Sequence, residues 1–144
     1  LDKYDLLEQM VAHYTAMFAQ RVSVRFQQII AGQIDDLLHS LLADMAENRQ
    51  TLQILFTVHE PDADLKANFY QLLYRQWETF IKSQPVAQPV PMELIASMGS
   101  NVQMTLIEWI IDHGESSLDG VAEAVNTIRK AILIQIKAPD DQLS

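Results

Sequence analysis

The residues of this 144-residue sequence best suited to metal chemistry are its four histidines, and no two of them have the spacing of ligands on one helix. Asp36 and His39 are three residues apart, a spacing that could place a carboxylate and an imidazole on one metal. Exposed polar pairs reach this spacing often by chance, so we expect no metal site. We expect His113 in the last turn of a helix, where a partly cationic imidazole suits the negative helix end.

Catalytic motifs are not found in the sequence. There is no Gly-rich phosphate loop, no recognisable serine nucleophile motif and no cysteine. The adjacent carboxylates Asp35-Asp36 and Asp140-Asp141 would diverge by about 100° on a helix and would not share a proton. We therefore predict that the chain is not an enzyme and that it uses no cofactor.

Aromatic and methionine side chains carry the strongest functional signal. They occur in several stretches of helical spacing, and an apolar ligand site needs such residues converging with a few polar groups for orientation. Methionine adapts to irregular shapes. We predict an apolar or aromatic small-molecule effector between the helices at 5–22, 63–83 and 92–113. The predicted lining residues are Tyr14, Phe18, Tyr70, Tyr74, Trp77, Met98 and Asn101.

A core without a ligand is the competing interpretation of these residues. Aromatic and methionine stripes at helical spacing are more often plain core than a binding site. Asn101 lies between apolar turns of its expected helix, where a buried polar group must have a partner. That partner is either a ligand or another side chain or water.

The elements that must position these side chains are helices. Apolar residues recur every three or four positions and no stretch alternates convincingly, so we predict an all-α bundle of about six or seven helices in one domain, residues 1–144. Asn48 is expected to cap a short helix. The expected bends and breaks are Val22–Val24, Gly32, Glu47–Arg49, His59–Asp62 and the proline-containing connector Gln84–Pro91.

The last two expected helices, about Met92–His113 and Leu118–Lys137, are apolar on more than one face. Gly114 is expected to end the first, and Ser116 with Asp119 to cap the second. The preceding helices can cover only one side of this pair, so we predict a homodimer in which two pairs form a four-helix bundle. The predicted interface residues are Val102, Leu106, Trp109, Ile110, Val121, Val125, Ile128 and Ile132. The alternative is a monomer in which Trp109 and Ile132 are core.

The net charge of −9 has the wrong sign for a nucleic-acid surface, so the chain by itself is not expected to bind DNA. No apolar run reaches the length of a membrane span, and we expect no membrane association. The lack of cysteine and of a signal peptide favours a cytoplasmic protein.

Three stretches resemble the TetR (tetracycline-repressor-like) family of transcriptional regulators. Residues 2–7, Asp-Lys-Tyr-Asp-Leu-Leu, resemble the end of that family's DNA-binding region, where a lysine and a leucine pair open the long linking helix. Glu47–Arg49, running into Leu52, Leu55 and Phe56, resembles a short helix of its ligand domains. The helix Leu94–His113, followed by Gly114 and the closing helix, resembles its dimerising pair.

The resemblance implies a particular division of labour. The helix-turn-helix that defines the family is not in this chain, so residues 1–144 would be the effector-binding and dimerisation domain, with residues 1–7 as the tail of a missing N-terminal DNA-binding domain. Effector binding would then alter DNA binding by that missing domain. The competing interpretation is a helical adaptor that binds a protein partner and no small molecule. A buried cavity near Tyr70, Tyr74 and Met98 would favour the sensor, and a shallow groove the adaptor.

Overall fold

The computed structural model describes residues 2–84, 91–114, 118 and 120–136, and in this part of the chain all regular structure is helical, which confirms the all-α prediction. The α-helices are α1 (Lys3–Ala31), α2 (Ile34–Met45), α3 (Arg49–Leu55), α4 (Leu65–Ser83), α5 (Met92–His113) and α6 (Val121–Ile134). A 3-10 turn, Ala46–Asn48, joins α2 to α3 without a loop. When α2, the 3-10 turn and α3 are counted as one continuous segment, the described residues contain five separate helices. The predicted number of six or seven is therefore not confirmed.

Helix α1 is continuous over 29 residues, so the helix does not stop at Val22–Val24, which was one of the two predicted outcomes there. The helix-propensity penalty of β-branched residues is only a few tenths of a kcal/mol each. Val22 is buried against the rest of the core, and this packing outweighs the penalty. The predicted break at Gly32 is confirmed, because Gly32 has φ 77° and its N–H closes the last turn of α1.

The structure places Asn48 at the start of α3, but the predicted side-chain cap is wrong. Its side-chain oxygen instead accepts a hydrogen bond from the Tyr14 hydroxyl of α1 at 3.1 Å. The next residue, Arg49, reaches in the other direction. Its Nε donates to the carbonyl oxygen of Ile111 at 3.0 Å and its Nη2 to that of Asp112 at 3.2 Å. The start of α3 therefore connects α1 to the C-terminal turn of α5.

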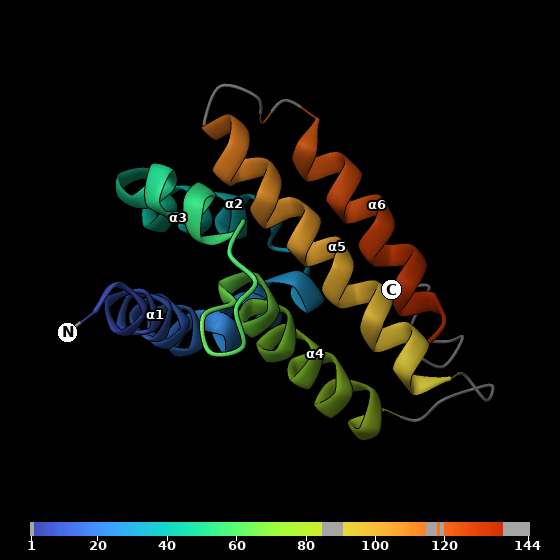
Figure 1. Ribbon diagram of the computed structural model, residues 1–144. Coiled ribbons are helices and arrows are strands. Elements are labelled where there is room, and N and C mark those ends of the chain that lie inside the picture. The colour runs from blue at the N-terminus through green and yellow to red at the C-terminus, as the bar shows by residue number, and fades with distance from the viewer. Residues whose placement is uncertain (1, 85–90, 115–117, 119, 137–144) are drawn as a thin grey trace.

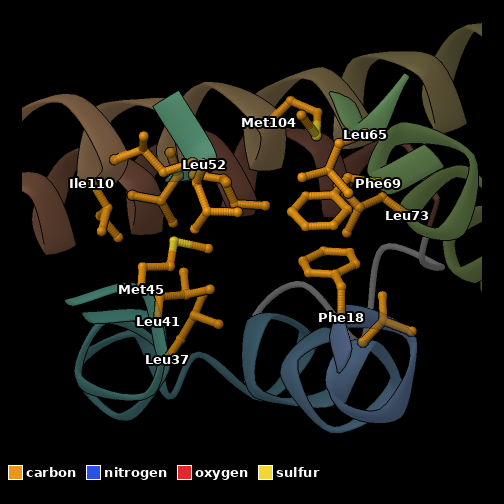
Figure 2. Packing of buried hydrophobic residues seen from close by; sticks show 14 of the residues in the cluster. Phe18, Leu37, Leu41, Met45, Leu52, Leu65, Phe69, Leu73, Met104 and Ile110 are labelled. Carbon is orange, nitrogen blue, oxygen red and sulfur yellow. The ribbon is translucent and has the colours of Figure 1, made fainter. Parts of the chain in front are cut away.

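Helix α4 packs against both α1 and α5 and so connects the first helix of the chain to the α5–α6 pair (Figure 1). Asp64 caps it by accepting from the backbone N–H of Ala67 at 2.9 Å. In the larger core cluster the ring of Phe18 from α1 stacks on that of Phe69 from α4, with centroids 3.9 Å apart (Figure 2). Leu37, Leu41 and Met45 of α2 enter the same cluster beside Ile110 of α5.

A second buried cluster surrounds Trp77 of α4. The indole meets the ring of Phe26 edge to face, with centroids 5.0 Å apart. Gly99 of α5 lies directly beneath the indole, since a Cβ added there would come within 2.3 Å of Trp77 Cε2. The cluster also contains Ile132, Leu133 and Ile136, which lie near the C-terminal end of the described residues.

Helices α5 and α6 run side by side along one edge of the molecule (Figure 1). Gly114 follows α5 with φ 64°, and α6 begins at Val121 behind Gly120, three residues later than predicted. The predicted Ser116–Asp119 cap lies outside the described residues, as does Lys137, the predicted end of the helix. His113 occupies the last turn of α5 as expected, with its Nδ1 3.0 Å from the carbonyl oxygen of Trp109.

Candidate functional site

The seven predicted ligand residues do not surround one cavity. Phe18 and Trp77 are buried in the two separate core clusters, whereas Met98, 48% exposed, and Asn101 lie on the outer surface of α5. The Trp77 indole N–H is already used by Gln103 Oε1, at 2.5 Å. The structure therefore distributes the predicted ligand residues among two core clusters and the outer surface of α5, and does not bring them together around one ligand.

Tyr70, Tyr74 and Asn101 lie together on the α4–α5 face. The Tyr70 hydroxyl donates to Ser97 Oγ at 3.1 Å, and Asn101 Nδ2 donates to the Ser97 carbonyl at 2.9 Å. Desolvation, reinforced by the carboxylates of Glu78 and Glu93, raises the pKa of Tyr74, whose hydroxyl stays protonated at neutral pH. Asn101 is exposed, so the expectation that it is a buried polar group in need of a partner is wrong.

An open groove of about 540 Å³ follows this face. Tyr70 and Asn101 line it, together with charged side chains such as Lys66 and Glu108, which form an ion pair at 2.9 Å. The groove is open rather than enclosed, and its lining mixes polar and apolar groups. It is therefore not a buried cavity of the kind that was expected near Tyr70 for a small-molecule sensor.

The other predicted residues, Tyr14 and Phe18, line a half-open cavity of about 70 Å³ between α1, α2, α3 and α4. Its apolar lining comes from all four helices, and its polar lining comes from α1, α2 and the 3-10 turn. The apolar residues are Met17, Phe18, Met45, Leu52 and Phe69, and the polar ones are Tyr14, Gln20, Arg21, Arg25, Asp44 and Asn48. An apolar lining with a few polar groups is the usual form of a small-molecule site.

The polar lining is built around the carboxylate of Asp44, which accepts from both Arg21 and Arg25. Arg25 is only 6% exposed, and its Nη2 also lies 3.4 Å from Ser40 Oγ. Its Nε is buried without a hydrogen-bond partner among the described residues. Burial, with the nearby charge of Arg21, lowers the pKa of Arg25 to about 10, so the guanidinium is still charged at neutral pH.

Sequence reasoning overlooked Arg25 and Asp44, although one signal was present. Phe18, Val22, Arg25 and Ile29 are separated by four, three and four positions, which places them on one helix face. An arginine in an apolar stripe is a charge at a core position, and buried charges are rare unless they have a partner or a function. The partner, Asp44, comes from a different helix and could not be assigned from spacing.

The predicted interface residues fall into three groups by exposure. Leu106, Ile110 and Ile132 are buried within the single chain, and Val102, Val121 and Val125 are half-buried. Trp109 and Ile128 are exposed, at 40% and 44%. Of the two residues in the monomer alternative, Ile132 is core and Trp109 is not.

The described residues contain no group of three or more acidic, histidine or cysteine side chains placed to hold a metal. His39, considered above with Asp36, has its Nδ1 2.7 Å from the Asp35 carbonyl oxygen. In the same part of the chain, no helix combines the length and apolar character that crossing a membrane requires.

No protein-family model matches this chain, and neither a curated protein nor a solved structure is significantly similar to it.

Proposed function

We propose that this chain is a homodimerising, small-molecule-sensing domain of a TetR-type transcriptional regulator. The observation that carries the proposal is a set of large apolar residues exposed on α5 and α6. Leu94, Met98 and Trp109 lie on one face of α5, and Ile128 and Ile134 are exposed on α6. Large apolar residues gathered along paired helices mark an interface more often than a surface in contact with water.

A second copy of the chain is the simplest cover for this surface. Ala124 and Ala131 are exposed on α6 and fall on the same face as Ile128, so a facing helix can approach closely there. A two-fold contact between two α5–α6 pairs would form a four-helix bundle and bury both stripes at once. We call the exposed residues Leu94, Met98, Trp109, Ile128 and Ile134 the α5–α6 stripe.

The cavity between α1 and α4 supplies the sensing part of the proposal. Its Tyr14–Asn48 hydrogen bond adjoins Arg49, which holds the carbonyl groups at the end of α5. A ligand that moves Asn48 would therefore also affect the adjacent Arg49. Arg49 is hydrogen-bonded to α5, which belongs to the proposed dimerising pair. Hydrogen-bonded contacts of this kind can carry coupling between two sites, and the TetR resemblance adds DNA binding through a missing N-terminal domain.

The mass of the protein in solution tests the dimer. Sedimentation equilibrium at tens of micromolar should give twice the chain mass of 16.4 kDa. Ile128→Asp would bury an unpaired charge at the contact and should return the mass to that of one chain. Ile54→Asp is the matched control, because Ile54 is exposed on α3, away from the stripe, and the dimer should survive. A wild-type monomer would overturn the proposal.

A helical adaptor is the second candidate, and the open groove at Tyr70 and Asn101 favours it. In that case the chain is monomeric, and a partner helix lies in the groove beside the Lys66–Glu108 pair. Sedimentation separates the two candidates, because the adaptor stays a monomer with or without Ile128→Asp.

A further inference from the structure

Arg25 occupies a core position at which its burial opposes folding. It lies in a stripe of α1 that is otherwise apolar, only 6% of it is exposed, and its Nε has no partner in the described residues. Leaving a buried charged donor unsatisfied is destabilising, because the group has lost its water without gaining a partner. A methionine of similar length would fill the same space without that cost. The structure therefore contains an unused, buried hydrogen-bond donor on a guanidinium that lines a cavity.

The charge around this cavity is unbalanced. Two guanidinium groups, Arg21 and Arg25, face the single carboxylate of Asp44. The other polar lining residues, Tyr14, Gln20 and Asn48, are neutral. Arg21 is more than half exposed and is screened by water, whereas Arg25 is buried and is screened much less. The residues that line the cavity thus carry one more positive charge than negative charge.

The apolar lining sets the shape of what could bind. Phe18 and Phe69 are stacked, and both line the cavity with Met45 and Leu52. The volume of about 70 Å³ is about half of the roughly 150 Å³ cavity that encloses a benzene ring, so only part of a small molecule is enclosed and the rest extends through the open side. A smaller void of about 20 Å³, also lined by Phe18 and Arg25, lies further into the core.

We propose that this cavity binds a small carboxylic acid with an apolar or aromatic body. The carboxylate accepts hydrogen bonds from Arg25, and the body lies against Phe18, Met45, Leu52 and Phe69. Arginine is suited to this task because its planar donors match the two oxygens of a carboxylate. The inference rests on the proposed sensing function and narrows its effector from any apolar molecule to an anionic one.

Benzoate and benzamide form the matched pair of ligands that tests the charge, since they share a ring and differ in the carboxylate. Binding to the full chain at pH 7 is followed by ¹H–¹⁵N spectra that include the arginine Nε–H signals. Benzoate should bind at about millimolar affinity, as expected for a fragment of its size, and at least about tenfold more tightly than benzamide. The Arg25 Nε–H signal, assigned by its loss in Arg25→Lys, should shift.

Two variants complete the test. Arg25→Met should weaken benzoate binding at least about tenfold and leave the weak benzamide binding unchanged. Arg75→Met removes an exposed guanidinium from α4, outside the cavity, and should bind benzoate as the wild type does. Equal affinity for the two ligands, or full benzoate binding by Arg25→Met, would overturn the inference.

The outcomes keep this inference separate from the function on which it rests. If benzamide binds in the cavity as well as benzoate does, the cavity is a small-molecule site without the proposed charge preference. If neither ligand shifts any signal of a cavity residue, the inference fails and the sensing function loses its support. The dimer is judged by sedimentation alone, and neither result changes that measurement.

Discussion

Trp77 Nε1 donates to Gln103 Oε1 at 2.5 Å in the interior of the molecule, where both side chains are buried. This bond ties α4 to α5 in the middle of their contact. Gln103→Leu would leave the indole N–H buried without a partner and should lower the free energy of unfolding by about 1–3 kcal/mol. Urea denaturation followed by tryptophan fluorescence measures the loss. Gln71→Leu, at an exposed position of α4, is the control and should leave stability nearly unchanged.

Gly99 should not tolerate even one additional methyl group. On an exposed helix, glycine to alanine is stabilising by about 1 kcal/mol. Here the new Cβ would lie 2.3 Å from Trp77 Cε2, and overpacking of this kind costs about 1–3 kcal/mol. We therefore expect Gly99→Ala to be destabilising in thermal unfolding. A Tm equal to or above that of the wild type would mean that α4 and α5 separate easily at this contact.

Arg49 is expected to hold the end of α5 in place. Its two hydrogen bonds satisfy carbonyl groups that a helix terminus leaves without partners, and Gln53 Nε2 adds a third at 3.1 Å to Ile111. Arg49→Ala should cost about 1–2 kcal/mol and should speed amide hydrogen exchange in the last turn of α5. Exchange in the first turns of α4 should not change, which provides an internal control. Uniform acceleration throughout the chain would instead indicate a general loss of stability.

Arg25→Met is expected to weaken ligand binding without lowering stability. The substitution relieves the desolvation of a buried charge and an unsatisfied Nε, and Asp44, which is partly exposed and keeps Arg21 as a partner, is not left as an unpaired buried charge. We expect the free energy of unfolding to stay within about 1 kcal/mol of the wild-type value or to rise. A loss well beyond that in urea denaturation would show that Arg25 is there to hold α1 against α2.

The pH dependence of stability provides a second test of the energetic cost of the buried Arg25 charge. Its pKa of about 10 in the folded chain lies below the ordinary value of an arginine side chain. The folded state therefore releases this proton before the unfolded state does, and the cost of the buried charge is fully present below pH 10. That cost should decline as the pH rises above about 10, and Arg25→Met should lack this contribution. Between pH 5 and 9, roughly, the two proteins should show parallel stability profiles.

The helices were predictable because their signals are local. The apolar period of α1, Gly32 after its last turn and Asp64 at the start of α4 all act over a few neighbouring residues. The helix does not stop at Val22–Val24 because a weak local preference was overridden by burial of Val22 in the core. Local propensity differences of tenths of a kcal/mol do not compete with the burial of a whole side chain, which contributes about 1.5–3 kcal/mol.

The candidate site was only partly predictable because its polar groups meet across helices. Tyr14 and Phe18 were identified from their types, and both line the cavity. Asn48 was expected to cap α3, yet it bonds to Tyr14, 34 positions away. Asp44 pairs with Arg25 from a neighbouring helix. Such pairings depend on how helices cross, which apolar spacing within one helix does not determine.

Because α1 is one continuous helix, a tilt at one of its ends displaces the other end. From the turn that contains Arg25 to Lys3 the helix spans 22 residues, or about 33 Å. Its first turns are little covered, with Tyr4 and Leu6 both more than half exposed. A ligand that tilts α1 by about 5° at the cavity would carry the Lys3 end through about 3 Å, given the 1.5 Å rise per residue of a stiff helix. A break at Val22–Val24 would have absorbed that motion, so the continuity of α1 at this point carries a small adjustment beside Arg25 to the start of the helix.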